Sequence, residues 1–178
     1  RIDNKTGVGT RNQLGATDPE HVISLEKLAN AVHRHGAKIF VQLQHPGSEG
    51  NPANNPQREI VAPSDVMCKL VGVKPRPLTT EDTERLVKKF IKGAKLSQIA
   101  GIDGVEIHGA HGYMVNQFLS PLTNRRTDKY GGSFEGRMTF ITEIVRGIQF
   151  VCGSDFPVSV RISADEFMEG GITLVEGV

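Results

Sequence analysis

DGVEIHGAHGYMVNQFLSPLTNRRTDKYGG, residues 103–132, is the stretch of the chain that decides the fold. It begins as a short apolar run at 105–107 and continues into residues dense in hydrogen-bonding groups. His108, His111 and Tyr113 follow that run directly. This composition is typical of a buried strand that opens into a functional loop, so we predict a strand followed by a loop that forms the site.

The segments on either side of this stretch alternate between helical and strand patterns. Helices are predicted from Asp18-Pro19 to Gly36, from a capping box at 79–82 to Gly101, and from Ser133 to Gly153. Strands are predicted at 37–43, 103–108 and 157–163. Residues 44–78 are expected to form a functional loop, and residues 164–178 a loop entering a fourth helix. The alternation predicts a parallel sheet with helices outside it.

Each predicted strand has one apolar face and one face with polar side chains, because side chains alternate along a strand. Gln42, His108 and Arg161 lie on the polar faces. Both faces are apolar in a doubly wound sheet, whereas the inner face of a β/α barrel is polar where ligands bind at its C-terminal rim. The pattern therefore favours a barrel with these three side chains at one mouth. The alternative for Glu106 is a structural ion pair with Arg161.

The composition is that of a globular protein with one domain. The chain has 178 residues, 38% of them hydrophobic and 23% charged, and a net charge of +1. We therefore expect no nucleic-acid partner, and the absence of a long apolar run predicts no membrane span. Cys68 and Cys152 are expected to be reduced thiols of a cytoplasmic protein. A start at Arg1 without a signal-peptide pattern suggests a piece of a longer chain.

Four motifs occur in order along the chain. They are VQLQHPG at 41–47, APS at 62–64, HGAHGY at 108–113 with the NQFLSP and NRRTDKYGGS segments after it, and VSVRIS at 158–163. Together they resemble the old yellow enzyme family of FMN-dependent oxidoreductases. The HGAHGY form is most similar to the enoate reductase and 2,4-dienoyl-CoA reductase branch of that family.

The resemblance implies a fold. Family members are eight-stranded TIM barrels, and this chain corresponds to about strands three to five. Residues 1–178 are therefore expected to be a partial FMN-binding barrel domain, about half of a whole barrel of ~250 residues. Two residues depart from the family pattern, Ser48 in place of an arginine and Gly136 in place of an asparagine.

The resemblance also implies roles for named residues. FMN is the expected cofactor, reduced by NADH or NADPH, and the substrate is a small unsaturated molecule. Gln42 and Arg161 are expected to hold the flavin, together with His108. His108 and His111 are expected to bind the substrate carbonyl, with Tyr113 as the general acid. His45 is expected to contact the substrate. Any iron–sulfur cluster or FAD would lie outside this chain.

Other interpretations are a metal site, a fragment without activity and a different reaction. A site made by His108, His111 and Glu106 is disfavoured, because no third ligand has convincing spacing, so no metal is predicted. A half-barrel without catalysis would leave open sheet edges, and a homo-oligomer would cover them. Family members that oxidise amines replace the strand histidine with an aromatic residue, and His108 argues against that activity.

Overall fold

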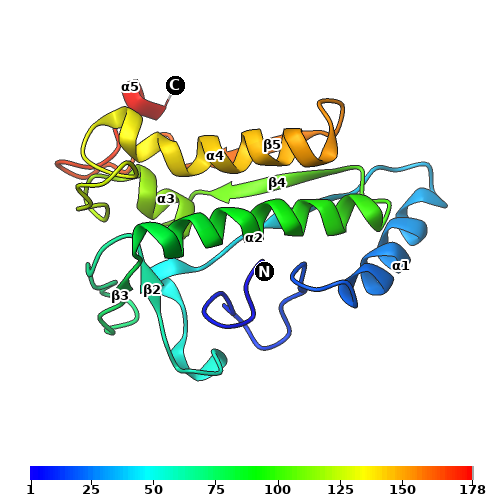
Figure 1. Ribbon diagram of the computed structural model, residues 1–178, viewed down its shortest axis with the longest axis horizontal. Helices are drawn as coiled ribbons and strands as arrows, with labels where there is room; N and C mark the ends of the chain where they lie inside the picture. The colour runs from blue at the N-terminus through cyan, green and yellow to red at the C-terminus, as the bar shows by residue number, and fades with distance from the viewer. Residues whose placement is uncertain (178) are drawn as a thin grey trace.

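Three parallel strands lie at the centre of the molecule. The computed structural model describes residues 1–177 (Figure 1). Its main sheet contains β1 (Phe40–Leu43), β4 (Gly104–Gly109) and β5 (Val158–Ile162), in the order β1-β4-β5. Both pairs of neighbours are parallel, which confirms the arrangement that the alternating pattern predicts.

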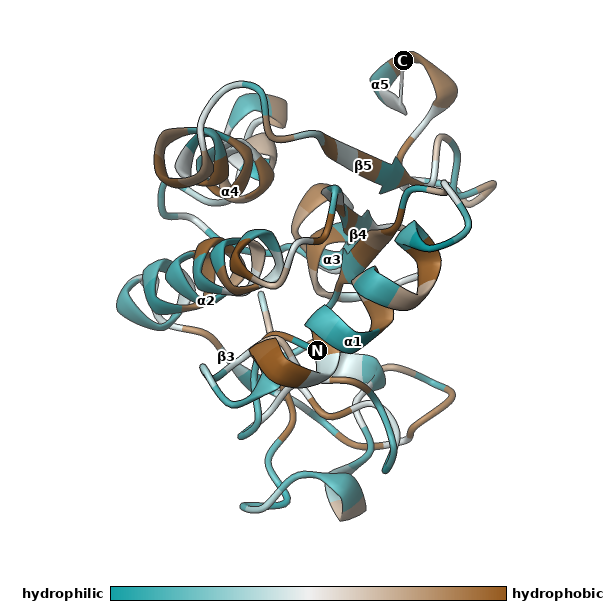
Figure 2. Ribbon diagram, turned by 90° about the vertical axis from the view of Figure 1, so that its right-hand side faces the viewer, coloured by the Kyte–Doolittle hydropathy of each residue, from teal (hydrophilic) through white to brown (hydrophobic). Residues whose placement is uncertain are grey.

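Two long helices cover one side of these strands. α2 (Thr80–Ile99) and α4 (Phe134–Cys152) run side by side along β4, and Figure 2 shows both on the same side of β4 and β5. The remaining elements are short or peripheral: α1 (His21–His33), η1 (Gly47–Glu49), η2 (Pro52–Asn54), β2 (Val61–Ala62), β3 (Arg76–Pro77), α3 (Met114–Leu119) and α5 (Leu174–Gly177).

Local hydrogen bonds set where the helices begin. The Thr79 hydroxyl accepts from the Asp82 amide and the Asp82 carboxylate accepts from the Thr79 amide, so α2 begins with a capping box. The Ser133 hydroxyl accepts from the Gly136 amide and so caps α4, as predicted. The predicted start of α1 is wrong. That helix begins at His21, because the Asp18 carboxylate accepts hydrogen bonds from Asn4 and Thr17 instead of capping it.

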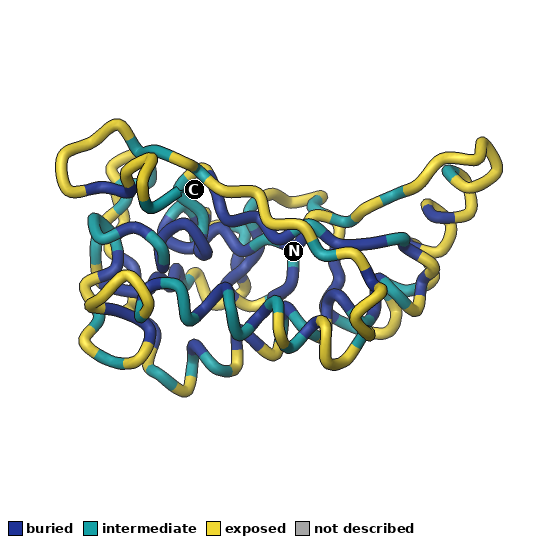
Figure 3. The backbone as a smooth tube through the Cα atoms, turned by 90° about the horizontal axis from the view of Figure 1, so that it is seen from above, coloured by how far each residue is buried: buried dark blue, intermediate teal, exposed yellow. Residues whose placement is uncertain are grey.

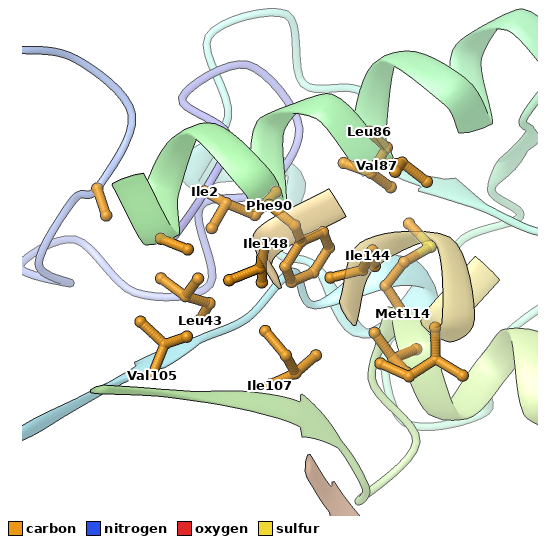
Figure 4. Close-up of a cluster of buried hydrophobic side chains, with 14 of the residues drawn as sticks. Ile2, Leu43, Leu86, Val87, Phe90, Val105, Ile107, Met114, Ile144 and Ile148 are labelled. Atoms are coloured by element: carbon orange, nitrogen blue, oxygen red, sulfur yellow. The ribbon is translucent and has the colours of Figure 1, made fainter. Parts of the chain in front are cut away.

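The hydrophobic core lies between the helices and the strands. Figure 4 shows Phe90 of α2 and Ile148 of α4 pointing toward Ile107 of β4. All three side chains are fully buried, and Phe90 and Phe140 meet edge to face with ring centroids 6.1 Å apart. The apolar faces of the strands thus pack against the helices, as a β/α unit requires.

The opposite side of the strands is open. Phe40 is 46% exposed, and Gln42 and Arg161 are also exposed. Figure 3 shows the buried backbone in the centre and exposed stretches in the loops at both ends. In the described part of the chain no helix combines the length and the apolar character needed to cross a bilayer.

The segments that the sequence predicts as loops contain short elements: η1, η2, β2 and β3 lie in the loop at 44–78, and two short α-helices lie in the later loops. α3 occupies part of the loop after β4, where no helix is predicted. Its six residues complete less than two turns, which is too short for a periodic signal, and tertiary contacts hold it. The predicted entry into a fourth helix is confirmed by α5, up to residue 177.

Candidate active site

A cavity of about 540 Å³ lies along β1, from Ile39 and Phe40 at its start to Gln42 and Gln44 at its end, and reaches the loop after β4. Gln42 at the end of β1, His108 at the end of β4, and His111 and Tyr113 in the following loop are among its lining residues. The structure therefore brings together four of the six residues that the sequence predicts for the site. Arg161 and His45 are not part of this lining.

His108 is buried, and only one of its ring nitrogens has a hydrogen-bond partner within residues 1–177. Its Nδ1 accepts a hydrogen bond from the Ala110 amide, 3.3 Å away, which assigns the proton of the neutral ring to Nε2. Burial lowers the pKa of His108 below its usual 6.5, and the nearby His111 and Arg161 lower that pKa further. The residue is therefore a neutral donor at neutral pH.

The turn after β4 holds His111 and Tyr113 against His108. The ring centroids of His111 and Tyr113 lie 5.1 Å and 4.9 Å from the centroid of the His108 ring, and both rings meet it edge to face. His111 has a left-handed backbone, with φ of 60°, and its amide donates to the Ser163 hydroxyl. Such a conformation is strained for a residue other than glycine and is often found at functional sites.

Strand register places the remaining polar groups on the same face. Gln42 pairs with Glu106 and His108 pairs with Arg161 in the parallel sheet. The Gln42 amide donates to the Glu106 carboxylate at 2.6 Å, so the expected alternative pair of Glu106 with Arg161 is not the one formed. Among residues 1–177, no carboxylate makes an ion pair with Arg161. Its exposed guanidinium is a cation on the open face.

His45 corrects the prediction of a substrate contact. The residue is 1% exposed, and both ring nitrogens are engaged. Nε2 lies 3.2 Å from the Thr6 hydroxyl, and Nδ1 accepts from the Gly47 amide. Its carbonyl also accepts from the Met114 amide. His45 therefore has a structural role: its hydrogen bonds connect the N-terminal segment to the loop after β1.

The sequence prediction missed several residues that line the cavity. Gln44 is one, and its Oε1 is buried without a hydrogen-bond partner in the described residues. It lies one residue beyond the end of β1 at Leu43, so the alternation of side chains along the strand does not predict it. Arg1 and Gln13 also line the cavity, but nothing in their local sequence indicates it.

A parallel β/α sheet in which histidine and tyrosine side chains at and after the end of a strand line a cavity is typical of β/α-barrel enzymes. The model of the NADH:flavin oxidoreductase / NADH oxidase family matches residues 2–178. An NADH oxidase of Thermoanaerobacter brockii is 48% identical over 99% of this chain, which covers 27% of that relative. The chain thus belongs to the NADH:flavin oxidoreductase / NADH oxidase family, the old yellow enzyme family, as predicted.

Solved structures agree with the fold. A complex of 2-naphthoyl-CoA reductase with 2-naphthoyl-CoA superposes with a TM-score of 0.88 at 33% identity, over 96% of this chain and 28% of that one. Morphinone reductase gives a TM-score of 0.86 at 29% identity, over 97% and 50%. The chain spans half or less of the length of each relative. Its fold is an incomplete (β/α)8 barrel, which confirms the predicted fold class.

Proposed function

We propose that these 178 residues form part of the FMN-binding barrel of an oxidoreductase. The enzyme moves hydride from NADH or NADPH, through the flavin, to the C=C bond of an α,β-unsaturated carbonyl, acid or thioester. The observation that carries this proposal is the group of His108, His111 and Tyr113 around one cavity, with a free Nε2 donor on a neutral imidazole.

The polar residues of the open face fit the pyrimidine end of a flavin. The Gln42 amide both donates and accepts, which matches the alternating edge of that ring. Arg161 supplies a permanent positive charge beside His108, and no carboxylate of residues 1–177 neutralises it. When bound, the flavin would supply the redox chemistry, and these side chains would orient it and stabilise negative charge.

His108, His111 and Tyr113 act on the substrate. The Nε2–H of His108 donates to the carbonyl oxygen, and His111 adds a second polar group to the same wall of the cavity. Both stabilise the negative charge that grows on this oxygen as hydride reaches the β-carbon. Tyr113 then gives its phenol proton to the α-carbon and regains one from water. The C=C bond gains one hydride and one proton, and the nicotinamide is oxidised.

The similar proteins support a ring or chain conjugated to a carbonyl as substrate. One solved relative is a reductase in complex with an aromatic acyl-CoA, and another is named for a morphinone. A cavity of about 540 Å³ is large enough for a small molecule of this kind.

The test is Tyr113→Phe in the complete protein that carries these residues, loaded with FMN. The two half-reactions are followed separately, with 2-cyclohexenone as the alkene. Reduction of the alkene should fall about 100-fold or more, because the general acid is lost, while flavin reduction by the nicotinamide survives. Equal loss of both half-reactions would contradict this role.

Tyr130→Phe is the matched control. Tyr130 is buried, whereas Tyr113 is half-buried. The Tyr130 hydroxyl donates to Glu143, and its ring packs between α3 and α4, away from the cavity. This variant should leave both half-reactions within about twofold of the wild type, because it removes a phenol that contacts no reactant.

A further inference from the structure

The turn that carries His111 and Tyr113 is held by a side chain with no role in the proposed chemistry. Gln117 lies in α3 and is 2% exposed. Its Oε1 accepts from the Ser48 amide at 3.1 Å, and its Nε2 donates to the carbonyls of Pro46 and Gly112, at 3.3 and 2.5 Å. One amide group therefore binds the loop after β1 and the turn after β4 at the same time.

Close packing keeps this amide in one position. Gly47 has a left-handed backbone, with φ of 61°, and a Cβ there would lie 2.2 Å from the Gln117 Oε1. The glycine thus allows the loop after β1 to lie directly on the amide. A buried amide with its acceptor and both donors engaged has no alternative orientation that keeps all three hydrogen bonds.

The turn itself needs external support. His111 and Gly112 are consecutive left-handed residues, with φ of 60° and 73°. Their peptide groups are bound on several sides, because the His111 amide donates to Ser163 and the Gly112 amide donates to Asn116. Gln117 holds the Gly112 carbonyl, which is the next group along the chain. Strained backbone of this kind persists only where the surroundings fix it.

We propose that Gln117 is a positioning residue that couples the loop after β1 to the turn after β4. It thereby fixes His111 and Tyr113 relative to His108. This inference rests on the proposed function, since it assigns a purpose to the position of those side chains. A displacement of about 1 Å at a reacting group costs up to about 100-fold in rate. Loss of the Gln117 hydrogen bonds should therefore slow the reduction of the alkene.

Asn124 provides a matched control. It is also buried, its Nδ2 donates to the carbonyls of Phe118 and Tyr130, and its Oδ1 accepts from the Arg126 amide. It therefore bridges two pieces of backbone through one amide, as Gln117 does, but none of its partners lies in the turn at 111–113. Gln117→Glu and Asn124→Asp each remove the donors and keep an acceptor.

The experiment compares both variants with the wild type in the complete FMN-loaded protein. Hydrogen exchange followed by mass spectrometry should show exchange at least about tenfold faster in Gln117→Glu at both 45–50 and 109–116, whereas Asn124→Asp loosens only 118–131. Reduction of 2-cyclohexenone should fall about tenfold or more in Gln117→Glu, with flavin reduction by the nicotinamide within about twofold. Gln117→Met, of similar volume, replaces Gln117→Glu if that variant does not fold.

If hydrogen exchange in Gln117→Glu is unchanged at 45–50 or at 109–116, Gln117 does not couple the two loops and the proposal is wrong. Faster exchange in both with alkene reduction no lower than in Asn124→Asp overturns the positioning role. A wild-type protein whose flavin is reduced but which reduces no alkene overturns the proposed function instead, and the exchange data alone then decide whether Gln117 couples the two loops.

Discussion

His45 and His108 are both buried imidazoles, but the hydrogen bonds around them differ. Thr6 and Gly47 engage both ring nitrogens of His45, whereas only Nδ1 of His108 has a partner among the described residues. A ring with both nitrogens engaged has no group left for a ligand, and a ring with one free N–H does. This difference separates a structural histidine from a site histidine more clearly than burial does.

The burial of His45 predicts a loss of stability in mild acid. Its pKa is lowered to about 4, chiefly by desolvation; the charge of Asp3 opposes this shift and the charge of Lys89 adds to it. The unfolded chain takes up this proton near pH 6.5 and the folded chain only near 4, so stability falls as the pH drops between these values. The shift corresponds to about 3 kcal/mol.

Urea unfolding at pH 7 and pH 4.5 checks this. His45→Gln cannot titrate and should show a smaller loss between the two pH values than the wild type. Asp3 does not confuse the comparison, since its pKa is lowered to about 2 and its contribution changes only below pH 3.8. Parallel pH dependences in the two proteins would show that the imidazole is not the cause.

Two glycines with the same backbone allow the packing on Gln117 to be measured. Gly36 and Gly47 are both left-handed, but a Cβ at Gly36 meets nothing within 4 Å. Gly36→Ala should cost about 1 kcal/mol of unfolding free energy from backbone strain alone. Gly47→Ala adds a collision with a buried amide and should cost about 1–3 kcal/mol more. Equal values from urea unfolding would contradict the close packing.

At this scale the sequence predicted the residues that share one short motif or one strand face. His108, His111 and Tyr113 meet because they follow one strand, and register puts Gln42 and Arg161 on the same side. His45 was expected in the site because of the motif at 41–47, and a motif does not say which way a side chain points; the residue is buried away from the cavity.

Among the elements, the long helices follow from local rules and the short ones do not. Thr79 and Ser133 cap α2 and α4 as predicted, because a side-chain oxygen and a free amide three residues later are local partners. α3 depends instead on partners distant in sequence, such as the Pro46 and Ser48 backbone that Gln117 binds. No pattern within six residues indicates such contacts.

The capping box of α2 has a measurable effect. Thr79→Ala removes the acceptor of the Asp82 amide and should lower the free energy of unfolding by about 1 kcal/mol. Thr139→Ala is the control, since its exposed hydroxyl only returns to the Glu135 carbonyl within α4, and should change stability by less than about 0.5 kcal/mol. Chemical denaturation measures both, and similar losses would argue against the cap.

For the whole molecule, parallel pairing and the placement of the helices were predictable from the order of elements. The covering of the open face was not, because strands that pair with β1 or β5 in a full barrel have no counterpart among residues 1–177. Phe40, which lies on this face with Gln42, is 46% exposed as a result. The main site residues lie on this side of the sheet.

The exposure of Gln42 and Arg161 predicts that the 178-residue chain alone holds FMN weakly. After addition of FMN and desalting, its visible absorbance should show no flavin band, whereas the complete protein should keep one. The physical reason is that groups exposed to water on an open sheet provide little of the enclosure that usually retains a cofactor. A yellow 178-residue protein would mean that these residues, alone or assembled, suffice.

The left-handed backbone of His111 also limits which amino acids can replace it. Asparagine, aspartate and glycine adopt this conformation with little strain, whereas valine, isoleucine and threonine do not. If position 111 is randomised, the active variants are therefore limited first to residues that adopt the left-handed backbone. Among those, the chemistry of the side chain decides the activity. Asparagine, which keeps both the conformation and a hydrogen-bond donor, is the informative exchange there, and alanine would confound the two effects.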